Sequence, residues 1–183
     1  MPVTKIMLIR HAEKPSDDGS VAGISSAGQL DPEALVVRGW QRAGALVRFF
    51  APLHGAFTDQ RLATPDVIFA SAVAKHSKSS RPQQTVLELA SALKLKLDLS
   101  FAKGNEAGLV QSAIAASGCV LIAWEHEAIP DIANRILGSS TICPQKWPGS
   151  RFDVVWIFER QGNGWSFAQV PQLLLSGDSP QPI

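Results

Sequence analysis

The chain has few of the residues that mark secreted, membrane-spanning or nucleic-acid-binding proteins. Its 183 residues include 2 cysteines, which is weak support for a disulfide framework and none for a zinc cluster. Its apolar runs are shorter than the roughly 18 residues of a membrane helix, and its first residues do not form a secretory signal. The formal net charge of +1 argues against a broad basic surface for nucleic acid. We therefore expect a cytoplasmic protein without nucleic-acid or membrane partners; its oligomeric state stays unknown.

Several catalytic motifs are also missing. The sequence has no Walker loop and no Gly-x-Gly-x-x-Gly. Seven residues separate Cys143 from Arg151, more than a cysteine-based phosphatase loop allows. The segment from Gly23 to Gly28 misses the nucleophile-elbow spacing by one residue. We expect no cofactor. We also expect no metal bound to His11 and His126, the two candidate histidine ligands, because the arginines beside them would repel a cation.

What is present is the pattern of a globular α/β protein. Hydrophobic residues make up 45% and charged residues 18% of the chain, which suits one folded domain over residues 1–183. Strand and helix patterns alternate, which predicts a three-layer α/β/α sandwich with a mostly parallel central sheet and a C-terminal antiparallel hairpin. Expected strands cover 3–9, 65–70, 95–99, 119–124, 153–158 and 165–170; expected helices cover 40–50, 81–93, 107–117 and 129–137. The Pro- and Gly-rich tail from residue 176 is expected to fray.

Polar residues follow three of the buried strands at the point where each strand ends. Arg10 and His11 follow the first strand, Ser71 follows the second with Arg81 beyond a loop, and His126 follows the third. The carboxyl ends of parallel strands meet at one edge of a sheet, which is where ligands bind in α/β proteins. The order of the strands therefore predicts that two guanidiniums and two imidazoles converge there.

That set of side chains suits phosphoryl transfer. Arginine forks bind phosphate oxygens in a bidentate manner and keep their charge. A neutral imidazole can attack phosphorus and so divide hydrolysis into two easier steps, and nearby arginine charge keeps the imidazole unprotonated. A carboxylic acid must also protonate the leaving oxygen.

The sequence resembles the histidine phosphatase superfamily, also called phosphoglycerate mutase-like. Its signature, Arg-His-Gly/Ala-Glu after the first strand, reads Arg10-His11-Ala12-Glu13 here. A second element, Ser…Arg-x-x-Gln-Thr, matches Ser71 and the run Arg81-Pro82-Gln83-Gln84-Thr85. The late histidine of the family matches His126. The resemblance spans residues 3–137, and the loop 72–80 is longer than the family's usual gap.

The resemblance implies a metal-independent phosphatase acting on a small phosphorylated substrate, a phosphomonoester or a phosphohistidine. His11 would be the nucleophile that becomes phosphohistidine, and Arg10, Arg81 and His126 would bind the phosphoryl group. The family's acid, where present, lies between the second arginine and the late histidine, and Glu106 fits that position best.

Three alternatives stay open. Glu88 lies in the same interval as Glu106, although it falls within a helix, and small phosphohistidine phosphatases of this group lack an obvious acid. A mutase would return the phosphoryl group to substrate instead of water, but the mutases' additional segments are not evident. A catalytically weak phosphate-binding module would keep the site and lose turnover.

Overall fold

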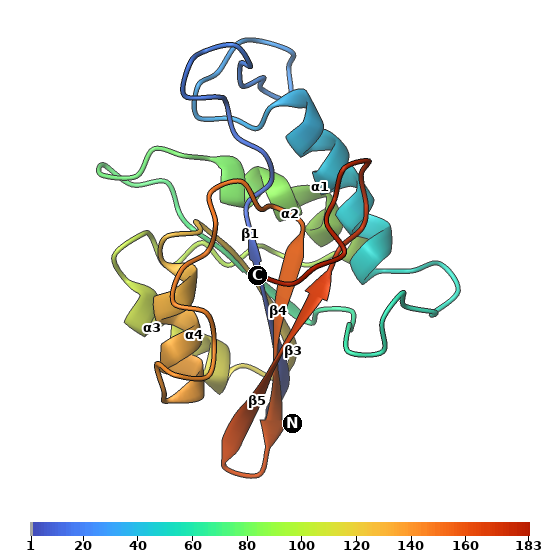
Figure 1. Ribbon diagram of the computed structural model, residues 1–183, viewed down its shortest axis with the longest axis vertical. Helices are drawn as coiled ribbons and strands as arrows, with labels where there is room; N and C mark the ends of the chain where they lie inside the picture. The colour runs from blue at the N-terminus through green and yellow to red at the C-terminus, as the bar shows by residue number, and fades with distance from the viewer. Residues whose placement is uncertain (1) are drawn as a thin grey trace.

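The computed structural model describes residues 2–183 and shows one open five-stranded sheet with helices packed on it (Figure 1). The strands are β1 (Val3–Arg10), β2 (Val67–Ala70), β3 (Gly118–Trp124), β4 (Val154–Gln161) and β5 (Gly164–Pro171). The helices are α1 (Val37–Phe50), α2 (Arg81–Leu93), α3 (Glu106–Ala115) and α4 (Ile129–Leu137).

The sheet has the strand order β2-β3-β1-β4-β5. Strands β2, β3 and β1 run parallel, while β4 pairs antiparallel with β1 and forms the C-terminal hairpin with β5. Arg10 is paired with Trp124 and Ala70 with Ala123, so the three parallel strands end level with one another. The segments that follow these strands therefore start from the same edge of the sheet.

Helices cover both faces of the sheet, which confirms the expected layered α/β fold. Successive side chains of a strand point to opposite faces, and β1 follows this rule. Met7 and Ile9 pack in the apolar cluster that includes residues of α1 and α2, whereas Ile6 and Leu8 pack with residues of α3 and α4. Figure 1 shows these two helix pairs on either side of the central strands.

Two sequence-based expectations are wrong. Residues 95–99 form no strand; Asp98 makes one isolated bridge to Phe69, and the segment lies at the outer edge beside β2. The tail from residue 176 is held in place instead of fraying, because the Asp178 carboxylate pairs with the guanidinium of Arg42, with Oδ1 2.7 Å from Nη2. No helix within residues 2–183 is long and apolar enough to cross a bilayer.

The tail joins a buried polar network that reaches the end of β1. Arg42 on α1 is 2% exposed, and its guanidinium binds both oxygens of Glu13, the amide oxygen of Gln172 and both oxygens of Asp178. The Asp153 carboxylate accepts from Ser179 N in the tail. Residues more than a hundred positions apart are thereby fixed against the segment that follows β1.

Candidate active site

Arg10, the last residue of β1, is 1% exposed and has only part of its guanidinium satisfied. Its Nη1 donates to the carbonyl oxygens of Gly149, at 2.6 Å, and Arg151, at 3.0 Å. Its Cζ lies 3.7 Å from the centre of the Phe152 ring. Burial lowers the pKa of Arg10 to about 10, so this side chain keeps its charge at neutral pH.

His11 follows Arg10 and has a defined tautomer. Its Nδ1 lies 2.7 Å from the carbonyl oxygen of Ala12, and a carbonyl can only accept, so Nδ1 carries the proton and Nε2 keeps its lone pair. Burial, together with the charges of Arg10, Arg81 and His126, lowers the pKa of His11 to about 3, and the hydrogen bond to Ala12 opposes them. The imidazole is therefore neutral and nucleophilic at physiological pH.

Arg81 is the first residue of α2, and its helix is fixed against the end of β1. Thr85 Oγ1 accepts from Ala12 N at 2.8 Å and donates to Arg81 O at 2.7 Å. Arg81 Nη1 donates to Pro32 O at 3.0 Å and lies 3.8 Å from Glu33 Oε2. Thr85, the last residue of the second motif, thus sets the position of Arg81 relative to the residue after His11.

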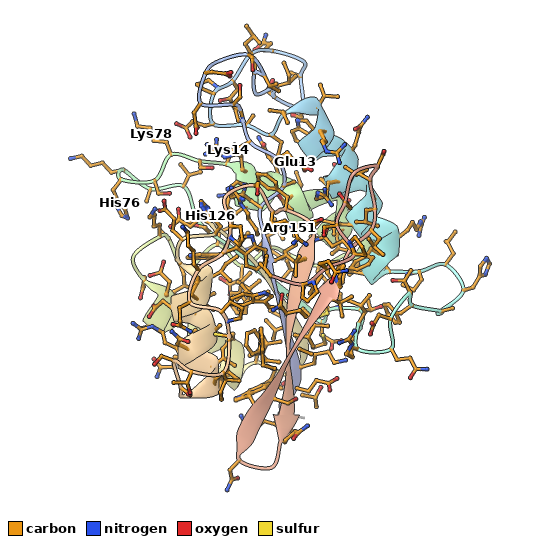
Figure 2. All side chains as sticks on the ribbon, in the orientation of Figure 1. Glu13, Lys14, His76, Lys78, His126 and Arg151 are labelled. Carbon is orange, nitrogen blue, oxygen red and sulfur yellow. The ribbon has the colours of Figure 1, made fainter. Side chains whose placement is uncertain are left out.

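His126 lies in the turn between β3 and α4, beside the loop that holds Arg10. A Cβ atom placed on Gly149 would stand 3.9 Å from His126 Nε2, while the carbonyl of the same Gly149 accepts from Arg10. Partial burial and the charge of Arg10 both lower the pKa of His126. Figure 2 shows His126 at the upper end of the sheet on the α4 side, with Glu13 towards α1.

These contacts place Arg10, His11, Arg81 and His126 around the carboxyl ends of the parallel strands. Three of their donor atoms, Arg10 Nε, Arg10 Nη2 and Arg81 Nε, are buried and have no hydrogen-bond partner within residues 2–183. Leaving a buried charged donor unsatisfied costs several kcal/mol, on the order of the desolvation penalty. Donors of this kind gathered beside a neutral imidazole suit an oxyanion with several acceptor oxygens.

Glu106, the acid predicted from the sequence, lies at the start of α3. Its Oε1 accepts from Gly104 N at 3.0 Å and from the indole Nε1 of Trp124 at 3.2 Å. Glu106 also lines a pocket of about 260 Å³ together with Lys103, Glu125 and Glu127. No contact of its carboxylate with the histidines or with Arg81 is present among the described residues. Its role as the acid stays a prediction.

Glu13, the fourth residue of the first motif, is held by two arginines of α1. Its carboxylate is bound by Arg42 and lies 3.3 Å from Arg38 Nε. This residue therefore ties the motif to α1 and, through Arg42, to the tail.

Sequence reasoning missed the residues that hold Arg10 in place. Gly149 and Arg151 act through backbone carbonyls, which every residue type carries, so side-chain identity gave no signal. Phe152 packs against the guanidinium and also lies 6.2 Å from the His11 ring, centre to centre. The turn at Trp147-Pro148-Gly149 was the one local hint that this loop has a fixed shape.

The fold is shared with several solved phosphatase structures. No protein-family model and no curated protein matches the sequence, but solved structures match along most of the chain. One is a protein assigned as the phosphohistidine phosphatase SixA of Agrobacterium tumefaciens, with 15% identity and a TM-score of 0.53, covering 90% of this chain and 96% of that one.

Two more neighbours are phosphatases solved with ligands. The phosphoserine phosphatase of Entamoeba histolytica, in complex with 3-phosphoglyceric acid, has 14% identity and a TM-score of 0.55 over 90% of this chain and 95% of its own. A mycobacterial glucosyl-3-phosphoglycerate phosphatase with bound VO3 has 12% identity and a TM-score of 0.54 over 91% of this chain and 97% of its own. Identities this low show the fold, and they confirm the suspected resemblance at that level.

Proposed function

We propose that this protein is a phosphatase that hydrolyses a small phosphomonoester or a phosphohistidine through a covalent phosphohistidine on His11. The observation that carries the proposal is the set of buried, unpartnered guanidinium N–H groups of Arg10 and Arg81 beside a neutral His11. The fold shared with known phosphatases supports it.

In the first step the lone pair of His11 Nε2 attacks phosphorus, and the bond from phosphorus to the leaving oxygen breaks. The hydrogen bond from Nδ1 to Ala12 O orients the ring and stabilises the positive charge that develops on it. Arg10, Arg81 and His126 hold the non-bridging oxygens, where charge is concentrated in the transition state. A carboxylic acid donates a proton to the leaving oxygen.

In the second step water attacks the phosphohistidine and releases inorganic phosphate. The N–P bond breaks, and its electron pair returns to Nε2. The deprotonated carboxylate takes the proton from the attacking water. The mechanism needs no metal, because guanidinium groups supply the positive charge at the phosphate.

The test is the hydrolysis of 4-nitrophenyl phosphate by His11→Ala, with His54→Ala as the matched control on an exposed loop. Removing a nucleophile costs on the order of 10³-fold or more in kcat, so His11→Ala is expected to fall to background while His54→Ala keeps full activity. Unchanged hydrolysis by His11→Ala would contradict the proposal. Rapid quenching of the wild type should also trap an acid-labile, alkali-stable phosphoryl group on His11.

The same proteins separate the proposal from its two alternatives. A mutase would convert a phosphoglycerate into its isomer without releasing phosphate. A binding module would bind vanadate or phosphate tightly and turn over no ester in a substrate panel.

A further inference from the structure

Four carboxylates line the pocket of about 260 Å³. Asp131 is exposed and paired with Arg135 on α4; the other three, Glu106, Glu125 and Glu127, differ in what holds them. Glu106 Oε1 already accepts two hydrogen bonds. Glu127 has a side chain that is 68% exposed, and its Oε2 lies 3.1 Å from Lys103 Nζ. Glu125 is 21% exposed, and its Oε2 lies 2.9 Å from the same ammonium.

Glu125 alone among these three has a buried carboxylate oxygen, Oε1, with no hydrogen-bond partner within residues 2–183. A buried, unpaired carboxylate oxygen is costly while it is charged, and protonation turns it into a donor. Lys103 occupies Oε2, so the proton of the neutral acid is directed to Oε1. The unpartnered oxygen is thus the one that can carry a transferable proton.

The position of Glu125 in the chain places this residue at the edge of the sheet that carries the site. It directly follows β3 and precedes His126, so it starts from the sheet edge where Arg10 and Ser71 also lie. Its charge acts on the guanidinium of Arg81, whereas the charge of Glu127 acts on Arg10 and His126. Glu125 therefore lies on the Arg81 side of the phosphate-binding groups.

The surroundings of Glu125 favour its protonated form. Burial raises the pKa of Glu125, the neighbouring charges of Glu127 and Glu106 raise it further, and Lys103 opposes them. By contrast, Lys103 holds the pKa of Glu127 below its usual range. A phosphate dianion bound close by would raise the pKa of Glu125 again, because like charges disfavour the carboxylate.

We propose that Glu125 is the catalytic acid of the reaction proposed above. As the bond from phosphorus to the leaving oxygen breaks, the proton on Glu125 Oε1 passes to that oxygen, giving a neutral alcohol and a Glu125 carboxylate. In the second step the carboxylate accepts a proton from water as the water oxygen bonds to phosphorus, and the acid is restored. This inference depends on the proposed function and adds the identity of its proton donor.

The experiment compares Glu125→Gln with Glu106→Gln and Glu127→Gln, which each remove one negative charge from the same pocket. Each variant is assayed for kcat/KM with phenyl phosphate, a poor leaving group, and with 2,4-dinitrophenyl phosphate, whose leaving group needs no proton. General acids contribute about 10²-fold or more. Glu125→Gln should lose about that factor with phenyl phosphate only, and the two control variants should show no such dependence on leaving group.

A second readout uses the return step. With 2,4-dinitrophenyl phosphate, Glu125→Gln should form the phosphohistidine at the wild-type rate and hydrolyse it slowly, so phosphoenzyme accumulates and kcat falls while kcat/KM holds. Glu125→Asp should recover part of the activity with phenyl phosphate. Circular dichroism and thermal melting establish that each variant is folded.

Two results would overturn the assignment of Glu125. One is unchanged kcat/KM with phenyl phosphate, or an equal loss with both esters, in Glu125→Gln. The other is the leaving-group dependence appearing in Glu106→Gln or Glu127→Gln instead. If His11→Ala has meanwhile lost all activity, the proposed function stands and only the identity of the acid is wrong; if His11→Ala is fully active, the proposed function itself fails.

Discussion

The two arginines of the candidate site, both proposed to bind the phosphoryl group, are held in different ways. Arg10 is 1% exposed, with its Nη1 fixed by two backbone carbonyls and its face covered by Phe152. Arg81 has a side chain that is 16% exposed, and it contacts one loop carbonyl, from Pro32, and a distant carboxylate, from Glu33. One guanidinium is part of the core, and the other borders the polar loops.

We infer from this difference a division of labour around the phosphate of the proposed reaction. The side of Arg10, backed by the Arg42 network, has a fixed geometry that suits a group common to every substrate. The side of Arg81, with Glu125 and Lys103, is less buried and can meet the variable part of a substrate.

The largest expected effect comes from breaking the network behind Arg10. Arg42→Ala would leave the buried carboxylates of Glu13 and Asp178 with only the partly exposed Arg38 beside them, and breaking a buried pair costs about 3–5 kcal/mol. The free energy of unfolding, measured by urea denaturation, should fall by that amount. The control is Arg135→Ala, which breaks the exposed pair with Asp131 and should cost about 0.5 kcal/mol or less. Equal losses in the two variants would contradict a structural role for the network.

Arg10→Lys should reduce kcat/KM for 4-nitrophenyl phosphate by about 10²–10³-fold, as expected for the loss of one preorganised transition-state donor. An ammonium cannot reproduce a planar fork whose position is set by Gly149, Arg151 and Phe152. Vanadate should raise the melting temperature of the wild type and leave that of the variant nearly unchanged. If Arg10→Lys keeps a kcat/KM near that of the wild type, the fixed position of the Arg10 guanidinium does not contribute to catalysis.

Arg81→Lys should cost less than Arg10→Lys, on the order of 10–10²-fold in kcat/KM, because lysine still supplies a point charge at a less constrained position. The assay and the folding control are the same as for Arg10→Lys. If the loss equals or exceeds that of Arg10→Lys, the contrast between the two sides is wrong.

The pH dependence of stability gives a smaller and separate test of how deeply His11 is enclosed. The pKa of His11 is about 3 in the folded protein against about 6.5 in unfolded chains, so below the latter value the unfolded state binds the additional proton. Stability should therefore decline as pH falls from about 6.5 towards 4, by about 1.4 kcal/mol per unit for this group. His11→Gln should lack that component when urea denaturation is compared at pH 6.5 and 4.5; parallel curves for the two proteins would refute the burial of a neutral imidazole.

The sequence predicts the frame of the site well, for a simple reason. Apolar runs identify the buried strands, and parallel strands end at one edge of the sheet. The sequence alone therefore assigns Arg10, His11 and His126 to that edge. The Gln-Thr pair that follows Arg81 fixes α2 to the segment after β1 and to the loop before α1. Gln84 Oε1 accepts a hydrogen bond from Leu35 N, and Thr85 Oγ1 accepts one from Ala12 N.

The sequence does not reveal contacts between polar residues that lie far apart in the chain, because such contacts follow no periodic pattern. The expectation of a frayed tail was wrong because composition alone cannot show that Asp178 meets Arg42, which is 136 positions away. Glu125 and Glu106 are both carboxylates beside expected elements, and only their hydrogen-bond partners tell them apart. The backbone carbonyls that bind Arg10 cannot be predicted from residue type, because every residue carries one.

The Arg42 network has a consequence for how the protein is made. Translation delivers Glu13 and Arg42 early, while Gln172 and Asp178 emerge only after the helices and nearly the whole sheet. Until then the guanidinium of Arg42 and the carboxylate of Glu13, which are buried in the folded protein, stay hydrated in the nascent chain. Ribosome-bound intermediates should therefore expose the α1 surface to chaperones and proteases until residues 172–179 leave the exit tunnel.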